Sequence, residues 1–103
     1  MDFTPNWKEP NCDLLVQAIL SLQNEEDVYR FLDDLCTITE IKAMSQRINV
    51  AKLLSVETTY NEVARETGAS TATISRVKRC LNYGADGYKR VLIKMQKESG
   101  HEK

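Results

Sequence analysis

Apolar residues recur along the chain at intervals of three and four positions, the spacing that places side chains on one face of a helix. No stretch shows a sustained alternation of apolar and polar residues, which is the pattern of a half-buried strand. The spacing therefore predicts six helices and an all-α fold. A residue suited to an N-cap stands at each predicted start; these residues are Asn11, Asn24, Thr37, Thr59, Ser70 and Asp86.

The first three predicted helices carry wide apolar stripes. These stripes are Leu14, Leu15, Ala18, Ile19 and Leu22, ending near Asn24; then Val28, Phe31, Leu32 and Leu35; then Ile41, Met44, Ile48, Ala51 and Leu54. Short amphipathic helices cannot bury such stripes by themselves. The pattern leaves two possibilities open, a compact monomer or burial against a partner.

The fourth and fifth predicted helices each end at a glycine. The fourth opens with the capping-box pair Thr59 and Glu62 and ends before Gly68. A similar pair, Thr37 and Glu40, opens the third predicted helix. We expect Gly84 to end the fifth helix in a left-handed conformation. The inward residues are Ile74, Val77 and Leu81 in the fifth helix and Tyr88, Val91, Leu92 and Met95 in the sixth.

The length of 103 residues predicts one domain. We expect an N-terminal arm at residues 1–11, a single helical domain at 12–95 and a frayed polar tail at 96–103. Phe3 and Trp7 in the arm receive no functional assignment.

Several kinds of chemistry lack the residues that they need. Cys12, Cys36 and Cys80 are odd in number and widely spaced, which argues against a disulfide scaffold. The one histidine, His101, falls in the predicted tail, so neither a structural metal site nor a nucleophile with a positioned base is expected. The four glycines fit no phosphate-binding loop. We therefore expect no enzyme activity and no metal.

The chain also lacks signals for export or membrane insertion. The first residues contain neither a basic region nor an apolar run, and no stretch approaches the roughly 20 apolar residues of a membrane helix. These features predict a cytoplasmic protein.

Charge is distributed unevenly. Residues 1–57 carry five Lys or Arg against ten Asp or Glu, whereas residues 58–103 carry nine against five. Residues 65–97 alone have a net charge of +6. A basic segment of this kind favours a polyanionic partner such as nucleic acid, although a solvated helix face would have the same composition.

Residues 60–81 have the spacing of a helix-turn-helix. The small Ala64 stands where two helices would meet, Gly68 follows four residues later in the turn, and Ile74 follows six residues after that. Val63 and Val77 complete a small apolar cluster. The spacing predicts a DNA-binding helix-turn-helix.

The predicted DNA face lies mainly on the second helix of this motif. Small residues at its start would let the backbone enter the major groove, and arginine can pair with guanine. No acidic residue occurs from Gly68 through Ala85. The candidate DNA-binding residues are Thr59, Asn61, Ser70, Thr71, Ala72, Thr73, Ser75, Arg76, Lys78 and Arg79. Thr73 could instead face neighbouring residues, and Lys78 suits a phosphate contact or a surface position better than a base contact.

Two sequence blocks resemble the Trp-repressor superfamily, in particular its YerC-like branch of bacterial proteins. The first block is Leu35-Cys36-Thr37 with Glu40, Ala43-Met44 and Arg47; the second is Gly68-Ala69 with Ala72-Thr73-Ile74-Ser75-Arg76. The resemblance extends from about Leu14 to Met95. It implies six helices, an intertwined homodimer formed by the first three helices and the last, and two DNA-reading heads about 34 Å apart.

The resemblance also indicates a possible effector pocket. The founding member binds tryptophan between two arginines, which match Arg47 and Arg76, with a hydroxyl residue matching Thr37. Val77 and Cys80 stand where the family has small Gly and Ser, and the added valine methyls would cost about 1–3 kcal/mol in the space of the indole. Tryptophan is thus not the expected co-repressor, and the effector, if there is one, is not identified. Asn61 and Ala64 also replace basic residues of the family, so its operator preference does not transfer.

These observations predict a homodimeric transcriptional regulator that represses by occupying a pseudo-palindromic site in double-stranded DNA. The alternative is a protein-interaction module whose helix-turn-helix packs against another protein, a role that the acidic first half would suit. A steep dependence of binding on salt would distinguish DNA from an apolar protein contact.

Overall fold

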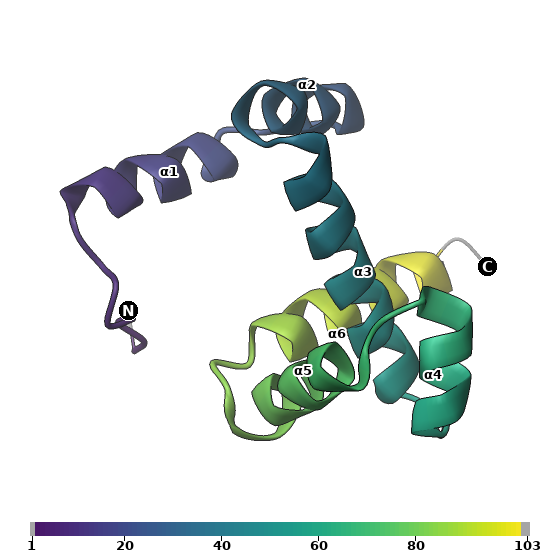
Figure 1. The fold of residues 1–103 in the computed structure, drawn as a ribbon. Coiled ribbons are helices and arrows are strands. Elements are labelled where there is room, and N and C mark those ends of the chain that lie inside the picture. The colour runs from purple at the N-terminus through teal and green to yellow at the C-terminus, as the bar shows by residue number, and fades with distance from the viewer. Residues whose placement is uncertain (1, 102–103) are drawn as a thin grey trace. The chain divides into compact units, whose positions relative to one another are not determined.

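The computed structural model describes residues 2–101, and the side chains of residues 2–98. These residues form six α-helices and no strand, which confirms the predicted all-α fold (Figure 1). The helices are α1 (Pro10–Leu20), α2 (Glu25–Leu35), α3 (Ile38–Leu54), α4 (Tyr60–Thr67), α5 (Thr71–Tyr83) and α6 (Gly87–His101). No helix in the described part is both long and apolar enough to cross a membrane.

The chain divides into two compact units, a first unit at Met1–Ile38 and a second unit at Thr39–Lys103. The sequence predicts a single domain over residues 12–95 and does not indicate this boundary. The division separates α1 and α2 from the helices that follow.

The second unit contains the buried core. Its fully enclosed residues come from α3, α4, α5 and the turn between α4 and α5, and half-buried residues of α6 pack against them (Figure 1). The core residues are Val50, Ala51, Val63, Ala69, Ile74 and Val77, with Leu53, Leu54, Ala64, Leu81, Tyr88 and Leu92 around them. The predicted stripe of α3 missed Val50 and included Met44, which is exposed. Val50 lies outside the predicted stripe because the end of α3 is buried on several sides, with Val50, Ala51, Leu53 and Leu54 all in or against the core.

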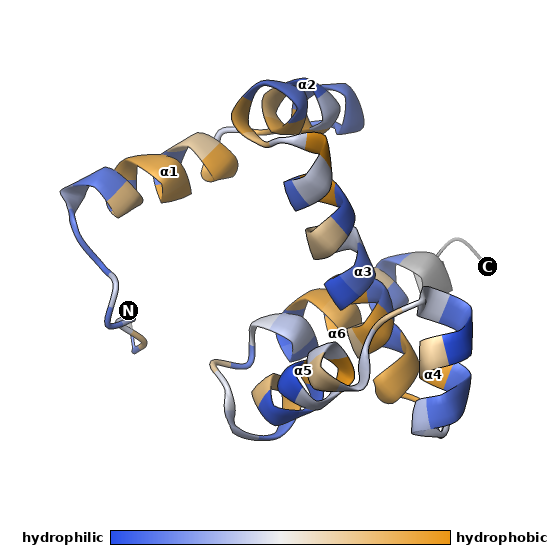
Figure 2. Ribbon diagram, in the orientation of Figure 1, coloured by the Kyte–Doolittle hydropathy of each residue, from blue (hydrophilic) through white to orange (hydrophobic). Residues whose placement is uncertain are grey.

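In the first unit the apolar stripes stay open within the single chain. None of residues 2–38 is buried, and Leu14 and Leu20 are 72% and 70% exposed. Figure 2 shows the apolar residues that run along α1. Two helices alone do not enclose a core, so the predicted inward faces of α1 and α2 are at most half-buried among residues 2–38.

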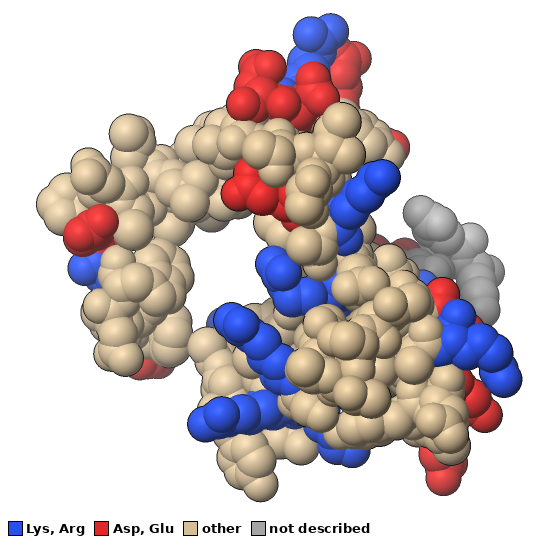
Figure 3. Space-filling view, in the orientation of Figure 1, with Lys and Arg blue, Asp and Glu red and all other residues tan. Residues whose placement is uncertain are grey.

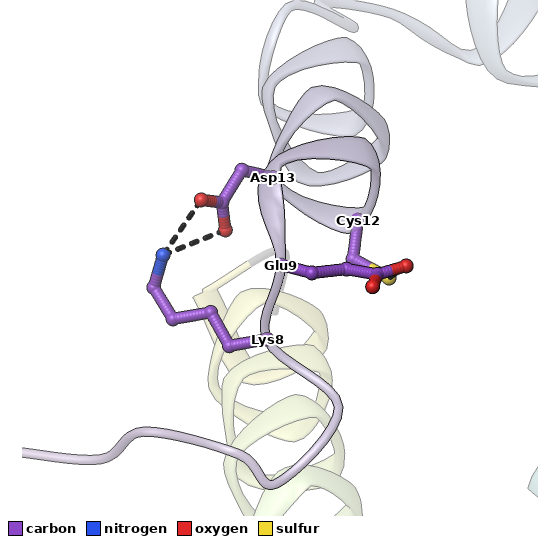
Figure 4. Close-up of polar contacts among 4 residues, drawn as sticks. All are labelled: Lys8, Glu9, Cys12 and Asp13. Atoms are coloured by element: carbon purple, nitrogen blue, oxygen red, sulfur yellow. Dashed lines mark hydrogen bonds and ion pairs between the residues drawn. The ribbon is translucent and has the colours of Figure 1, made fainter.

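The start of α1 is tied by charged side chains rather than by the predicted cap. The helix begins at Pro10, and its N-cap is Glu9, whose side chain makes no capping bond; the prediction of Asn11 as the cap is wrong. Proline suits the first helical position because its φ is already helical and its missing N–H has no intrahelical acceptor there. Lys8 Nζ lies 2.8 and 2.7 Å from the two carboxylate oxygens of Asp13 (Figure 4).

Cys12 lies on the same turn of α1. Its thiol is 3.8 Å from Glu9 Oε1. Partial burial, together with the nearby carboxylates of Glu9 and Asp13, raises the pKa of the Cys12 thiol. A raised pKa keeps this thiol protonated and weakly nucleophilic near neutral pH.

Other predicted caps have mixed outcomes. The Asn24 side chain accepts a bond from the Asp27 backbone N–H at 2.9 Å, as predicted. The prediction for Gly84 is wrong, because its φ is −88° and its ψ is −154°. Glycine is needed there for a different reason, since a Cβ would collide with the carbonyl oxygen of Cys80.

The final helix begins directly after the predicted Asp86 but extends further than predicted at its other end. Asp86 precedes it with a φ of +64°, whereas an N-cap residue is normally extended. The Asp86 carbonyl accepts the first helical bond, from Arg90 N at 3.0 Å. At its other end α6 continues through His101, beyond the predicted limit at residue 95. The last part of the predicted frayed tail, residues 102–103, lies outside the described residues.

Candidate nucleic-acid interface

Helices α4 and α5 form the predicted helix-turn-helix. Thr59 Oγ1 accepts a bond from Glu62 N at 3.2 Å, and the Glu62 carboxylate accepts one from Thr59 N at 3.4 Å, which confirms the capping box. Gly68 ends α4 with a φ of +71°. This left-handed conformation disfavours residues with a Cβ, so the glycine predicted for the turn is required by backbone geometry.

The apolar cluster behind the motif is also as predicted. Val63 on α4 and Ile74 and Val77 on α5 are at most 1% exposed, and they pack with Val50 and Ala51 of α3. Ala64 is half-buried and lies against the same core. These contacts fix α5 to the rest of the second unit and leave its opposite face in solvent.

The start of α5 is held by its own hydroxyls. Ser70 Oγ accepts a bond from Thr73 N at 3.1 Å and donates one to Thr73 Oγ1 at 3.1 Å. Thr73 is half-buried, and both its backbone N–H and its hydroxyl are hydrogen-bonded to Ser70. The other candidate residues on the motif are exposed; they are Thr59, Asn61, Ser70, Thr71, Ala72, Ser75, Arg76, Lys78 and Arg79.

Among residues 2–98, no carboxylate pairs with the cations of α5. The ion pairs among residues 2–98 are Lys8 with Asp13 and Arg30 with Glu26, and both lie in the first unit. Within that same range no carboxylate pairs with Arg76, Lys78 or Arg79. Figure 3 shows acidic side chains gathered over α2 and cationic ones projecting from the second unit. The exposed face of α5 therefore offers positive charge and hydroxyl groups to an anionic partner.

Tyr60 also lies beside this face, although no pattern in the sequence indicates it. Its ring lies 5.3 Å, measured to the centroid, from Lys78 Nζ. Tyr60 is the first residue of α4, and Lys78 lies eighteen positions later on α5. No helical or strand periodicity links residues at this separation, so the pair appears only once the two helices are packed.

The capping carboxylate of Glu62 has a perturbed titration. A hydrogen bond of 2.7 Å from Thr58 Oγ1, together with the bond from Thr59 N, lowers the pKa of Glu62. Both bonds favour the ionised carboxylate. The ionised carboxylate of Glu62 therefore stabilises the N-terminus of α4.

A polar contact joins α3 to the turn of the motif. Gln46 Nε2 on α3 donates to the carbonyl oxygen of Thr67, the last residue of α4, at 3.2 Å. Thr67 Oγ1 in turn donates to the Val63 carbonyl at 2.7 Å and accepts from Ala69 N at 3.1 Å. The same region encloses a polar cavity of about 390 Å³ that Gln46, Asn49, Lys52, Leu53, Glu66 and Thr67 line.

The residues of the predicted effector pocket have different surroundings. Val77 is buried in the core, Arg47 on α3 is half-buried, and Arg76 and Cys80 on α5 are exposed. Thr37 directly precedes α3 and belongs to the first unit. Cys80 lines an apolar cavity of about 480 Å³ with Ile48, Ala85, Gly87, Tyr88 and Val91. Of the five predicted residues, Cys80 alone is among those that line this cavity.

Two capped helices, a left-handed glycine turn, a shared apolar core and a cationic outer helix define a helix-turn-helix protein. The chain belongs to the Trp repressor family, because its residues 10–96 match the family described as Trp repressor protein. No group of three metal-ligating residues suited to an ion occurs in the described part.

Individual relatives agree with this assignment. The chain is 56% identical over 84 residues to the uncharacterized protein YerC of Bacillus subtilis strain 168. The matched region covers 82% of this chain and 81% of the relative. A putative Trp repressor from Staphylococcus aureus superposes with a TM-score of 0.83 at 49% identity, over 86% of this chain and 89% of the other. A TrpR-like protein from Eubacterium eligens ATCC 27750 also superposes with a TM-score of 0.83. The two are 53% identical, over 86% of this chain and 92% of the other.

Proposed function

We propose that this protein is a transcriptional regulator that binds DNA through α5 and represses by occupying a pseudo-palindromic operator in the cytoplasm. The observation that carries the proposal is the outer face of α5, where Arg76, Lys78 and Arg79 are exposed without a carboxylate partner among residues 2–98. The family membership supports the same role.

The chemistry of α5 suits a groove of duplex DNA. Thr71 and Ala72 are small and exposed at the start of the helix, so the backbone can approach base edges in a groove about 12 Å wide. Arg76 and Arg79 are three positions apart and share one face. Each guanidinium can donate two bonds to the acceptors of a guanine or clamp a phosphate.

The proposed molecule is a homodimer. The support is the uncovered apolar surface of α1 and α2, on which Leu14, Ile19 and Leu20 are more than half exposed. A second copy of this chain would cover that surface and provide the second reading helix that a pseudo-palindromic site requires.

Tryptophan has no part in this proposal. Val77 is buried in the core at the position where the family has glycine, and its added methyl groups would compete with an indole for space. The proposal requires no effector for DNA binding.

The test measures DNA affinity by fluorescence anisotropy, with a duplex selected by the wild-type protein from a random pool. Arg76→Ala and Arg79→Ala should each weaken binding by about 1–3 kcal/mol where a base contact is lost. Lys52→Ala is the matched control, because it removes one exposed cation from α3, outside the motif.

Unchanged affinity in both arginine variants would disprove the proposed face. The apparent association constant of the wild type should also fall steeply with salt. Binding to a protein rather than DNA, with little dependence on salt, would support the alternative of a protein-interaction module.

A further inference from the structure

The ring of Tyr60 and the ammonium of Lys78 connect the two helices of the motif. At 5.3 Å from the ring centroid, Lys78 Nζ is within the range of about 6 Å for a cation–π contact. Tyr60 begins α4 and Lys78 lies midway along α5, so the contact crosses the seam between the helices.

The contact limits an otherwise mobile side chain. Lysine has four rotatable bonds and loses considerable rotamer entropy when a contact fixes its ammonium group. Lys78 is exposed, and within residues 2–98 it has no carboxylate that would hold it elsewhere. The aromatic face thus restrains this charge in the free protein.

We propose that Tyr60 is a positioning residue that holds Lys78 in place as a contact to the DNA phosphate backbone. This inference rests on the proposed function of the motif. A ring covers one side of the ammonium, and the donors on its other side stay available to a phosphate oxygen. Because the ring already restrains Lys78 in the free protein, less side-chain entropy is lost on binding. Affinity rises without any new contact.

The position of the pair favours a phosphate over a base. Bases are read near the N-terminal end of a recognition helix, where Ser70, Thr71 and Ala72 lie. Lys78 is the eighth residue of α5, and its ammonium is turned toward the start of α4. A phosphate contact adds affinity that is independent of sequence and contributes about one to the slope of log affinity against log salt.

The experiment is a double-mutant cycle on a mixed-sequence duplex of about 30 base pairs, long enough for two half-sites. Its variants are Tyr60→Leu, Lys78→Ala and their combination, and Tyr60→Phe is the control that keeps the ring. Affinity is measured by fluorescence anisotropy at several salt concentrations, and thermal unfolding verifies that each variant folds.

We expect Tyr60→Leu to weaken binding about two- to five-fold for each chain that contacts the DNA when Lys78 is present, and to have no effect in the Lys78→Ala background. Tyr60→Phe should bind like the wild type. Lys78→Ala should lower the salt slope by about one for each chain that contacts the DNA, which is about two for the proposed dimer. In the free protein, NMR should show the Lys78 side-chain protons shifted upfield by the ring in the wild type and Tyr60→Phe, and not in Tyr60→Leu.

Failure of the inference and failure of the proposed function give different outcomes. Equal losses from Tyr60→Leu with and without Lys78, or loss in Tyr60→Phe, would overturn the positioning role while leaving DNA binding intact. A wild-type protein that binds neither this duplex nor the selected one would overturn the proposed function and the inference together. An unshifted Lys78 spectrum in the wild type would overturn the inference alone.

Discussion

The first and second units are built from the same kind of amphipathic helix, yet they bury their apolar residues very differently. The second unit encloses Val50, Val63 and Ile74 completely, whereas no residue among 2–38 is buried. Four helices can surround a core from several directions, and α1 and α2 alone cannot. Periodicity therefore identifies which face of a helix is apolar, and the number of neighbouring helices determines whether that face is covered.

The largest expected effect is on the core of the second unit. Ile74→Ala should lower the free energy of unfolding by about 2–5 kcal/mol, because it removes a fully buried side chain and leaves a cavity. The exposed neighbour Ser75 provides the control, and Ser75→Ala should stay within about 0.5 kcal/mol. Urea unfolding followed by circular dichroism measures both. A loss below about 1 kcal/mol in Ile74→Ala would mean that this core is not the stable part of the molecule.

The next effect concerns the open surface of the first unit. Ile19→Lys should convert the proposed dimer to a monomer, because it places a charge on the apolar face of α1. Gln17→Lys puts the same charge on another side of that helix and should leave the dimer intact. Sedimentation equilibrium distinguishes the two species. A wild-type protein that sediments as a monomer at micromolar concentration would contradict the proposed dimer.

Two glycines of the second unit give a smaller and more specific comparison. A Cβ at Gly68 or at Gly87 would meet no atom within 4 Å, and only Gly68 has a positive φ. Gly68→Ala should therefore destabilise the protein by about 1–2 kcal/mol, the cost of a left-handed residue with a Cβ. Gly87→Ala should be neutral or stabilise it by up to about 1 kcal/mol. Thermal unfolding of both variants provides the test, and equal losses would show that φ is not the cause.

The smallest expected effect is the acid response of the α4 cap. The pKa of Glu62 is lowered in the folded protein, so its contribution to stability is present above its unfolded pKa of about 4.3 and is lost as the pH falls through the folded value. Urea midpoints measured between pH 7 and pH 3 should therefore decline less steeply in Glu62→Gln than in the wild type. Identical pH profiles would show that the carboxylate charge has no part in the cap.

Much of the second unit could be predicted from the sequence because its signals are local. The caps at Thr59 and Ser70, the turn at Gly68 and the inward residues Ile74 and Val77 each depend on neighbours within a few positions. The same reasoning placed the exposed side chains of α5 correctly. Their contacts with DNA remain a prediction.

The misses have both local and non-local causes. The miss at Gly84 is local, because a glycine there indicates a special backbone position without distinguishing a left-handed turn from a close approach to the carbonyl of Cys80, four residues earlier. The Tyr60–Lys78 pair depends on the packing of α4 against α5. The boundary between the units is equally non-local, because it reflects which helices share a core.

The hydrogen bond from Gln46 to the last carbonyl of α4 ties α3 to the turn between α4 and α5. A sliding or twisting of α3 has either to break that bond or to take the turn along with it. Any displacement of α3 would therefore change the orientation of α4 and α5, through this amide and through the core that Val50 and Ala51 share with Val63, Ile74 and Val77.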